Sequence, residues 1–329
     1  FRNYKIFRNN GIKSVISDLL FLNGNLKRRS NFQKFWHEYF NLTDRKYSGE
    51  NADFQLSEDF KNYDALICGS DQIWNLDCTL GPIAPFFLSF ASNETKKIAY
   101  APSLSHAKFD EKNFTLNDRE KISKWLNNFD AISVRELSVA KQFQDLTNKP
   151  IKETLDPTLL LDLKEYKEIQ ALNLPKRIRT RGYVFAYTLW PNADMVRYVD
   201  QLARKNDLTI IYYSKAPINY QSRSINAWGI GPDAFLTLID GADCVISNSF
   251  HATVFSILYG KPFLTFGTKK SNSRMKTLLA NLGLSEKHLL PIAFNNENSI
   301  EPFPSPLNQD KLLRLRASSE QFLNKALME

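Results

Sequence analysis

Short apolar runs alternate with amphipathic segments along most of this 329-residue chain. The apolar runs are continuous rather than alternating, which is typical of parallel strands covered by helices on both faces. We expect strands at 63–68, 97–101, 131–134, 152–155, 183–189, 208–213, 244–247 and 262–266. The helical period predicts helices at 117–127, 137–144, 193–205, 233–241, 251–259 and 273–281. This repetition of strand and helix predicts an α/β fold with doubly wound sheets.

Two lobes are expected from the length and from a polar stretch near the middle of the chain. Domains commonly hold about 150 residues, so a chain of 329 residues suggests two of them. The segment 157–180 is polar and basic without a strong period, and we place the boundary there. The first lobe is then 1–165 and the second 166–305. Residues 306–329 predict a terminal amphipathic helix, for which crossing back to the first lobe is one arrangement.

The net charge of +8 is concentrated at one end of the chain. The first 50 residues contain ten Lys or Arg and four Asp or Glu, whereas the rest is close to neutral. A nucleic-acid interface should spread its basic residues along a binding face, so we expect no nucleic-acid partner. Aromatic residues such as Phe32 and Trp36 lie among the basic ones. This pattern fits a solvated helical flank, or a surface that meets anionic lipid or a lipid-linked acidic glycan.

The cysteines and the hydropathy exclude several classes of protein. Cys68, Cys78 and Cys244 belong to no CxxC pair, so we expect no disulfide scaffold, no metal site and a reducing compartment. No apolar run approaches 18 residues, and we therefore expect no membrane-spanning helix. A hydrophobic content of 43% is too high for a disordered chain. These features predict a globular cytoplasmic protein.

A polar cluster follows the first predicted strand, 63–68. Gly69 permits a tight turn there. The polar residues after it are Ser70, Asp71, Gln72 and Asn75. Ligands of open α/β sheets bind beyond the carboxyl ends of strands, so we assign this cluster to a site in which Trp74 stacks on a sugar ring. The alternative is a helix start, with Ser70 or Asp71 as the N-cap and Trp74 in the core.

A second polar group lies between the strand at 244–247 and the helix that follows it. Its members are Ser247, Asn248, Ser249 and His251. The first N–H groups of a helix lack intrahelical partners and favour an anion, and a histidine there can donate to the anion or transfer a proton. Lys270 and Arg274 follow the next strand and are candidates to complete an anion pocket. A solvated helix entrance is the alternative for these two cations.

Two further side chains end strands of the first lobe. The planar fork of Arg135 suits a carboxylate or a phosphate, although an ion pair with Glu136 or Asp130 is the alternative. Tyr100 and Ser103 end the strand at 97–101 and are candidates for the same cleft.

Several separated blocks resemble the polysaccharide pyruvyl transferase family. They are YDALICGSDQIWN, SVRE, LDPTLLL, and GADCVISNSFHATVFSILYGKPF with a following NSR. The resemblance implies two Rossmann-like lobes similar to the glycosyltransferase-B fold. It also implies transfer of pyruvate from phosphoenolpyruvate to sugar hydroxyls of a surface glycan, as a ketal, without a cofactor. Members usually open with a strand and an Asn-Tyr-Gly-like loop, so we expect the first lobe to lack its amino-terminal strand.

The resemblance also suggests roles for individual residues. We expect His251 to contact phosphate or to act as the general acid, and Asp71 to take the proton of the sugar hydroxyl. The helix start at 247–249 would hold one anionic group of phosphoenolpyruvate, and Arg135, Lys270 or Arg274 the other.

Two other functions compete with this interpretation. One is a nucleotide-sugar-dependent glycosyltransferase of the same fold, although the chain has no GxGxxG fingerprint. The other is a non-catalytic glycan-binding protein. The sugar acceptor would be lipid-linked if the basic segment meets the inner face of the plasma membrane.

Overall fold

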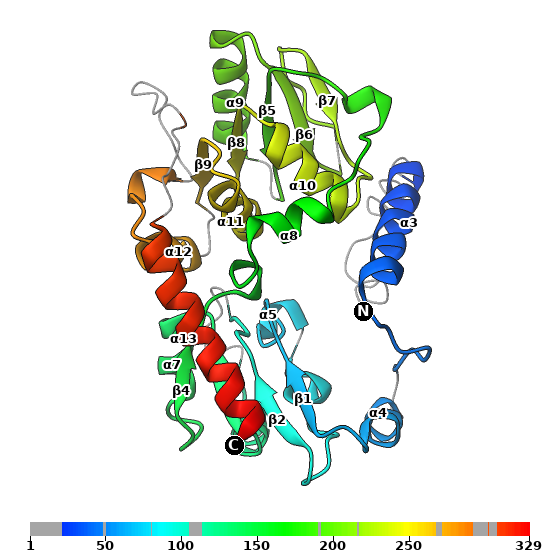
Figure 1. Ribbon diagram of the computed structural model, residues 1–329, viewed down its shortest axis with the longest axis vertical. Helices are drawn as coiled ribbons and strands as arrows, with labels where there is room; N and C mark the ends of the chain where they lie inside the picture. The colour runs from blue at the N-terminus through cyan, green and yellow to red at the C-terminus, as the bar shows by residue number, and fades with distance from the viewer. Residues whose placement is uncertain are drawn as a thin grey trace. The chain divides into compact units, whose positions relative to one another are not determined.

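The computed structural model describes residues 22–48, 51–79, 81–104, 114–189, 192–215, 217–267, 272–291, 302 and 308–329 (Figure 1). Two compact units divide the chain between them. Unit 1 combines the described parts of 1–42, 163–269 and 285–306, and unit 2 those of 43–162, 270–284 and 307–329. Each unit is built on a parallel sheet, so the predicted α/β fold is confirmed.

Unit 2 contains a four-stranded sheet in the order β1-β2-β3-β4. Its strands are β1 (Ala65–Cys68), β2 (Lys96–Ala99), β3 (Ala131–Val134) and β4 (Ile151–Glu153). Its helices are α4 (Ala52–Phe60), α5 (Leu76–Thr79), α6 (Leu116–Asn127), α7 (Leu137–Phe143), α12 (Ser273–Leu282) and α13 (Gln309–Met328). Short 3₁₀ turns, η1 (Ala84–Phe87) and η2 (Pro157–Leu159), complete it. The core joins the inner faces of the strands to Ile122 and Leu126 of α6, which a capping box at Thr115 begins.

Unit 1 contains a six-stranded parallel sheet in the order β10-β9-β8-β5-β6-β7. Its strands are β5 (Tyr183–Tyr187), β6 (Thr209–Tyr213), β7 (Ser224–Asn226), β8 (Cys244–Ser247), β9 (Phe263–Phe266) and β10 (Leu289–Leu290). Its helices are α3 (Leu22–Tyr39), α8 (Leu163–Glu168), α9 (Ala193–Lys205), α10 (Pro232–Gly241) and α11 (Phe250–Leu258), with 3₁₀ turns η3 (Lys176–Ile178) and η4 (Glu286–His288). α9 packs on one face through Val199, and Phe235 of α10 meets Phe185 on the other. Helices on both faces explain why the strands are continuously apolar.

The helix α3 belongs to unit 1, whereas the sequence placed residues 1–165 in the first lobe. Arg28 explains this difference, since its Nε donates to the hydroxyl of Tyr213 at 2.7 Å. The guanidinium also lies 4.7 Å from the ring centre of Phe32 and 5.2 Å from that of Trp228. A cation held between two aromatic rings stabilises this docking.

The C-terminal helix α13 belongs to unit 2 and lies beside β4 (Figure 1). The hydroxyl of Ser319 accepts from the backbone N–H of Leu155 at 3.1 Å. Arg316 is 8% exposed and donates to the carbonyl oxygens of Leu159 and Leu161 and to Asp162. These bonds fix the chain just after β4, where the candidate site begins.

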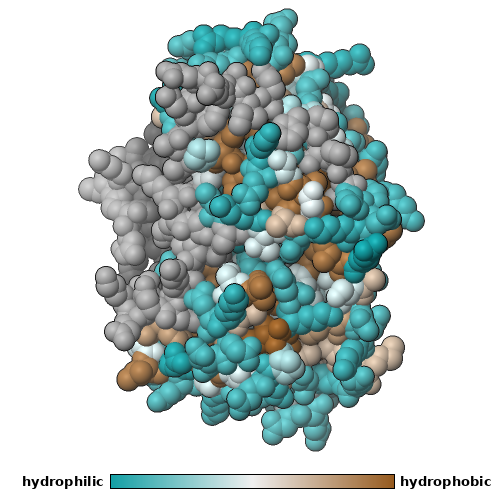
Figure 2. Space-filling model, turned by 90° about the vertical axis from the view of Figure 1, so that its left-hand side faces the viewer, coloured by the Kyte–Doolittle hydropathy of each residue, from teal (hydrophilic) through white to brown (hydrophobic). Residues whose placement is uncertain are grey.

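Among the residues that Figure 2 colours, hydrophilic ones are the more common, and hydrophobic ones form small groups among them. No helix within the described ranges is both long and apolar enough to cross a lipid bilayer.

Candidate functional site

The carboxyl end of β1 is joined to that of β2 by a close backbone approach at Gly69. This residue has a φ of +118°, and a Cβ added to it would lie 2.0 Å from the carbonyl oxygen of Tyr100. Only glycine fits such a position. The backbone N–H of Ser103 then donates to the carbonyl of Asp71 at 2.7 Å. The turn therefore holds Asp71 at the same edge of the sheet as the ends of β2 and β3.

Arg135 is the centre of the polar cluster at this edge. Its side chain is 3% exposed, and its Nη2 lies 2.9 Å from Oδ2 of Asp156, whose side chain is 1% exposed. The same nitrogen donates to the hydroxyl of Ser70 at 2.7 Å, and Nη1 lies 3.6 Å from Oδ1 of Asp71. A buried guanidinium needs such partners because an uncompensated charge is costly inside a protein. Asp71, by contrast, has a side chain that is 56% exposed and open to a ligand.

Arg274 approaches the same carboxylate from α12. Its Nη1 lies 3.9 Å from Oδ1 of Asp71, and its side chain is 23% exposed. Burial lowers the pKa of Arg274, and the neighbouring Glu136 opposes this effect. Arginine nevertheless remains charged in proteins. The sequence placed Arg274 beside the second-lobe helix start, whereas the structure places it in unit 2 with Asp71 and Arg135.

Glu136 is a buried carboxyl group that the sequence treated only as a partner for Arg135. It is 1% exposed, and its Oε1 accepts a hydrogen bond from the hydroxyl of Ser103 at 2.7 Å. Burial raises the pKa of Glu136, while Ser103, Arg135 and Arg274 act in the opposite direction. The sequence feature that could have pointed to Glu136 is its position directly after Arg135 at a strand end. It was not sufficient, because adjacent opposite charges in a sequence usually indicate an exposed ion pair.

Three residues assigned to the site are structural. Trp74 is 1% exposed, stacks on Phe87 at 5.0 Å and donates its Nε1–H to a backbone carbonyl, so it cannot stack on a sugar. Asn75 is fully buried; its Oδ1 accepts from the N–H of Asp77 and its Nδ2 donates to Oε1 of Gln72. Tyr100 is 5% exposed and its hydroxyl donates to the carbonyl of Leu155 at 2.9 Å. Burial raises the pKa of Tyr100 to about 12.

The point where the strand order of unit 1 reverses lies between β5 and β8. β6 follows β5 on one side of it, and β8 pairs with β5 on the other. Ligands of open α/β sheets bind outside the carboxyl ends of the strands at this kind of position. The hydroxyl of Ser247 donates to the carbonyl of Tyr187 at 2.9 Å, and Oδ1 of Asn248 accepts from the N–H of Leu189 at 2.9 Å. These two side chains therefore build the junction between the strands.

The helix α11 begins at this junction. Ser249 is its N-cap, and the hydroxyl accepts from the N–H of Ala252 at 3.4 Å. Ser247, Asn248 and Ser249 are 1%, 6% and 5% exposed. His251 is partly exposed in the first turn, with its ring edge-on to Phe250. Of the four predicted residues, His251 is thus the one whose side chain is open to a ligand.

The sequence matches the model of the family described as polysaccharide pyruvyl transferase over residues 3–270. The chain belongs to this family. Its members are transferases, and the resemblance stated from the sequence blocks is confirmed. No curated protein sequence matches the chain significantly.

Solved structures share the fold of this pyruvyl transferase family member. UDP-GlcNAc 2-epimerase from Methanocaldococcus jannaschii aligns with a TM-score of 0.53 at 13% identity, over 89% of this chain and 88% of that one. The enzymes of the same name from Neisseria meningitidis and Rickettsia bellii have TM-scores of 0.48 and 0.47 at 12% and 11% identity. They cover 88% and 89% of this chain, and 79% and 86% of their own. At such identities the likeness is one of fold, and the expected glycosyltransferase-B-like architecture is confirmed.

The family member therefore carries two polar groups at strand ends, one in each unit. In unit 2 the structure brings together Ser70, Asp71, Arg135 and Arg274. In unit 1 it places His251 at the switch point. Lys270 lies outside the described residues. Within the described ranges, no three His, Cys, Asp or Glu side chains are grouped as a metal ion would require.

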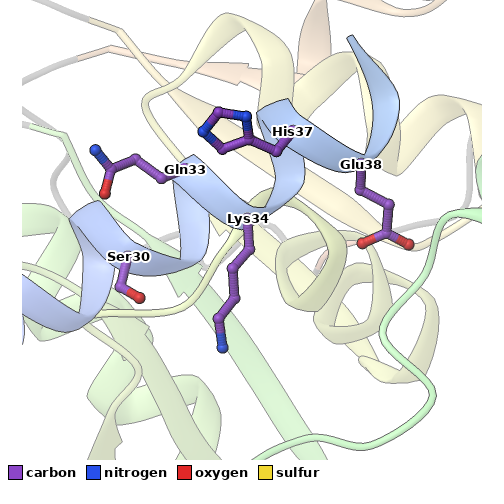
Figure 3. Close-up of a pocket in the computed structure, with 5 residues that line it drawn as sticks. All are labelled: Ser30, Gln33, Lys34, His37 and Glu38. Carbon is purple, nitrogen blue, oxygen red and sulfur yellow. The ribbon is translucent and has the colours of Figure 1, made fainter.

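The described residues that line a hollow on unit 1 all belong to α3 (Figure 3). The side chains are Ser30, Gln33, Lys34, His37 and Glu38. Figure 3 shows Gln33 and His37 on one side of the helix and Lys34 and Glu38 on the other, so these groups do not converge on one ligand. The hollow therefore adds no residue to the candidate site.

Proposed function

We propose that this protein transfers pyruvate from phosphoenolpyruvate to two hydroxyl groups of a sugar in a surface glycan, forming a cyclic ketal. Membership of the polysaccharide pyruvyl transferase family is the observation that carries the proposal. The arginine and carboxylate groups at the sheet edge of unit 2 support it, since the donor is an anion and the acceptor must lose protons.

The chemistry requires two new bonds at C2 of phosphoenolpyruvate. A proton adds to the vinyl methylene, a sugar hydroxyl attacks C2, the bond from C2 to the phosphate oxygen breaks, and a second hydroxyl closes the ring. The two sugar hydroxyls lose two protons in total. One proton's worth of hydrogen ends in the new methyl group, and the other leaves with the phosphate as hydrogen phosphate. The reaction therefore needs an acid, a base and cations that hold the donor.

Unit 2 supplies candidates for the base and for one anion contact. Asp71 is exposed and accepts a proton from the sugar hydroxyl in our assignment. Arg274 is partly exposed beside the same carboxylate and, in our assignment, binds an anionic group of the donor. Arg135 is buried between Asp71 and Asp156 and acts mainly as a positioning residue.

Unit 1 supplies a candidate for phosphate contact and for the acid. His251 lies in the first turn of α11, whose positive dipole end favours an anion. A histidine that contacts the phosphate can also donate a proton. In our assignment, His251 and the start of α11 hold the phosphate group.

Purified protein can be tested with phosphoenolpyruvate and a pyruvate-free glycan, following phosphate release and the ketal methyl signal by NMR. Loss of an acid or base commonly reduces kcat by about 10²–10⁴-fold, and we expect this for Asp71→Asn and His251→Ala. Glu120→Gln and His37→Ala are matched controls on exposed positions of α6 and α3 and should retain activity. Phosphate release by His251→Ala at the rate of the wild type would refute the role assigned to His251.

Other donors separate this proposal from the alternatives. Turnover of a nucleotide sugar without turnover of phosphoenolpyruvate would identify a glycosyltransferase. Saturable glycan binding without phosphate release from any donor would identify a binding protein. Either result would refute pyruvyl transfer.

The acceptor in our proposal is attached to a membrane lipid, and α3 supports this. The helix contains Lys27, Arg28, Arg29 and Lys34 against a single Glu38, and its Leu26 and Trp36 are 56% and 46% exposed. Basic residues beside exposed apolar and aromatic ones suit an anionic lipid surface. Binding to vesicles with anionic lipid at low salt, and loss of binding at high salt, is the expected result; no binding at low salt would leave α3 as a solvated flank.

A further inference from the structure

Glu136 has no role in the proposed reaction, although its carboxyl group lies in unit 2 near Asp71, Arg135 and Arg274. It follows β3 directly and begins α7. Its Oε1 accepts from the hydroxyl of Ser103, and its Oε2 is buried without a hydrogen bond from the part of the chain that the structure describes. A fully ionised carboxylate would normally not be left in this state, because each buried charge needs partners.

Among the residues that the structure describes, two carboxylates and two cations lie around Glu136. Asp71 after β1 and Asp156 after β4 are carboxylates, and Arg135 after β3 and Arg274 on α12 are cations. The hydroxyl of Ser103 comes from the end of β2.

One further carboxylate faces the same helix start. Oε1 of Glu153 on β4 accepts from the backbone N–H of Leu137 at 3.3 Å and from Nδ2 of Asn281 on α12 at 3.5 Å. Ionised Glu136 therefore adds negative charge to a cluster in which both described cations, Arg135 and Arg274, are already beside a carboxylate.

We propose that Glu136 takes up a proton when an anionic donor binds to Arg274 in this cluster, and returns it to solvent when the anion leaves. The proposal deepens the function above and rests on it for the identity of the anion, phosphoenolpyruvate. In its neutral form Glu136 no longer competes with the donor for Arg274. No bond other than the O–H of the carboxyl group forms or breaks, and the solvent supplies and receives the proton.

The electrostatics support the direction of this coupling. Burial raises the pKa of Glu136 above its ordinary value of 4.5, whereas Arg135 and Arg274 lower it. A bound anion adds a like charge nearby and weakens the effect of both arginines, so it must raise the pKa further. Proton uptake follows at any pH between the pKa values of the free and bound states. By linkage, the affinity for the anion falls by up to tenfold per pH unit in this interval as the pH rises.

Calorimetric titration with phosphoenolpyruvate measures the uptake directly. The apparent binding enthalpy is compared between buffers with different ionisation enthalpies at several pH values from 5 to 8, and the slope is the number of protons taken up. We expect a slope that includes up to one proton from Glu136 in the wild type and in Glu120→Gln. Glu136→Gln should lose this contribution, with an affinity that depends less on pH. The donor's own phosphate titrates equally in all variants, so the difference isolates Glu136.

Two further variants keep the test decisive. Glu136→Asp retains an acid and should retain uptake, with its maximum at a different pH, which a purely structural role would not produce. In the His251→Ala background, adding Glu136→Gln should still remove the same proton uptake, because the scheme assigns that proton to Glu136 alone. Equal proton uptake by the wild type and Glu136→Gln would overturn the proposal.

Binding and turnover are separate measurements. A protein that binds phosphoenolpyruvate with the Glu136-dependent uptake but never releases phosphate would refute pyruvyl transfer alone. Turnover without the difference in uptake would refute the coupling alone. Absence of phosphoenolpyruvate binding would overturn both.

Discussion

Replacing Arg135 by methionine should destabilise unit 2 more than most substitutions at a candidate site. The guanidinium and the carboxylate of Asp156 lie 2.9 Å apart, and their side chains are 3% and 1% exposed. Removal of one partner of a buried ion pair costs about 3–5 kcal/mol, because the other charge stays buried without compensation. Asp156 keeps hydrogen bonds from the N–H and hydroxyl of Thr158. We therefore expect a loss near the lower end, about 3 kcal/mol.

A second substitution separates stability from function. In Arg135→Met with Asp156→Asn both charges are removed, and replacement of a buried pair by neutral groups is often nearly neutral in stability. We expect the double variant to recover about 2 kcal/mol relative to Arg135→Met, while binding of phosphoenolpyruvate stays weak because Asp71 and Ser70 have lost their partner. Hydrogen exchange of β3 and β4 amides along a urea series reports the opening free energy of unit 2, and calorimetry reports binding.

The outcomes are distinct. A loss below about 1 kcal/mol in Arg135→Met would mean that water screens the pair, as it does at exposed ion pairs, and would refute the argument from burial. A double variant no more stable than the single one would show that the lost packing of Arg135, rather than the uncompensated charge of Asp156, sets the cost.

Three further predictions concern neighbouring residues. Trp74→Ala should lower the free energy of unfolding by about 3–5 kcal/mol, because Trp74 is 1% exposed and stacks on Phe87. A changed KM for the glycan with an unchanged urea midpoint would instead mean that Trp74 contacts the sugar. Gly69→Ala should lower Tm, because residue 69 has a φ of +118° and its new Cβ would lie 2.0 Å from the carbonyl oxygen of Tyr100. An unchanged Tm would contradict this close approach. Burial raises the pKa of Glu136 in the folded protein above its ordinary value of 4.5. As the pH rises from 4.5 through the raised pKa, the free energy of unfolding of the wild type should therefore fall relative to that of Glu136→Gln. Urea midpoints between pH 4 and 8 measure this difference, and parallel curves would contradict it.

The strands were predictable because both faces of each sheet are covered. All eight expected strands are present within two residues of their predicted bounds, as for β3 at Ala131–Val134. β7 (SIN) and β10, of three and two residues, were not predicted; neither presents a continuous apolar run in the sequence. α3 has no buried residue, so its pattern carries no apolar stripe that could have revealed it.

The candidate site was only partly predictable from sequence. Strand ends predicted that Asp71 and Arg135 lie together, and the structure places their side chains 3.6 Å apart, because parallel strands bring their carboxyl ends to one edge. The inward or outward direction of a side chain after a turn depends on backbone angles that the sequence does not show, and Trp74 and Tyr100 are therefore buried where exposed side chains were expected. Arg274 joined unit 2 through a chain crossing that no local pattern contains.

The packing of α13 on unit 2 sets an order of events during synthesis. Ser319 bonds to Leu155, 164 residues earlier, and Lys96 donates to the carbonyl of Leu327, 231 residues later. At about 5–20 residues per second, roughly 10–30 s pass between translation of Leu155 and of its partner. Most of unit 1, at 163–269, leaves the ribosome in that interval. The nascent strands of unit 2 therefore wait without α13, and the ends of β2 and β4 that it contacts stay uncovered until the last residues are made.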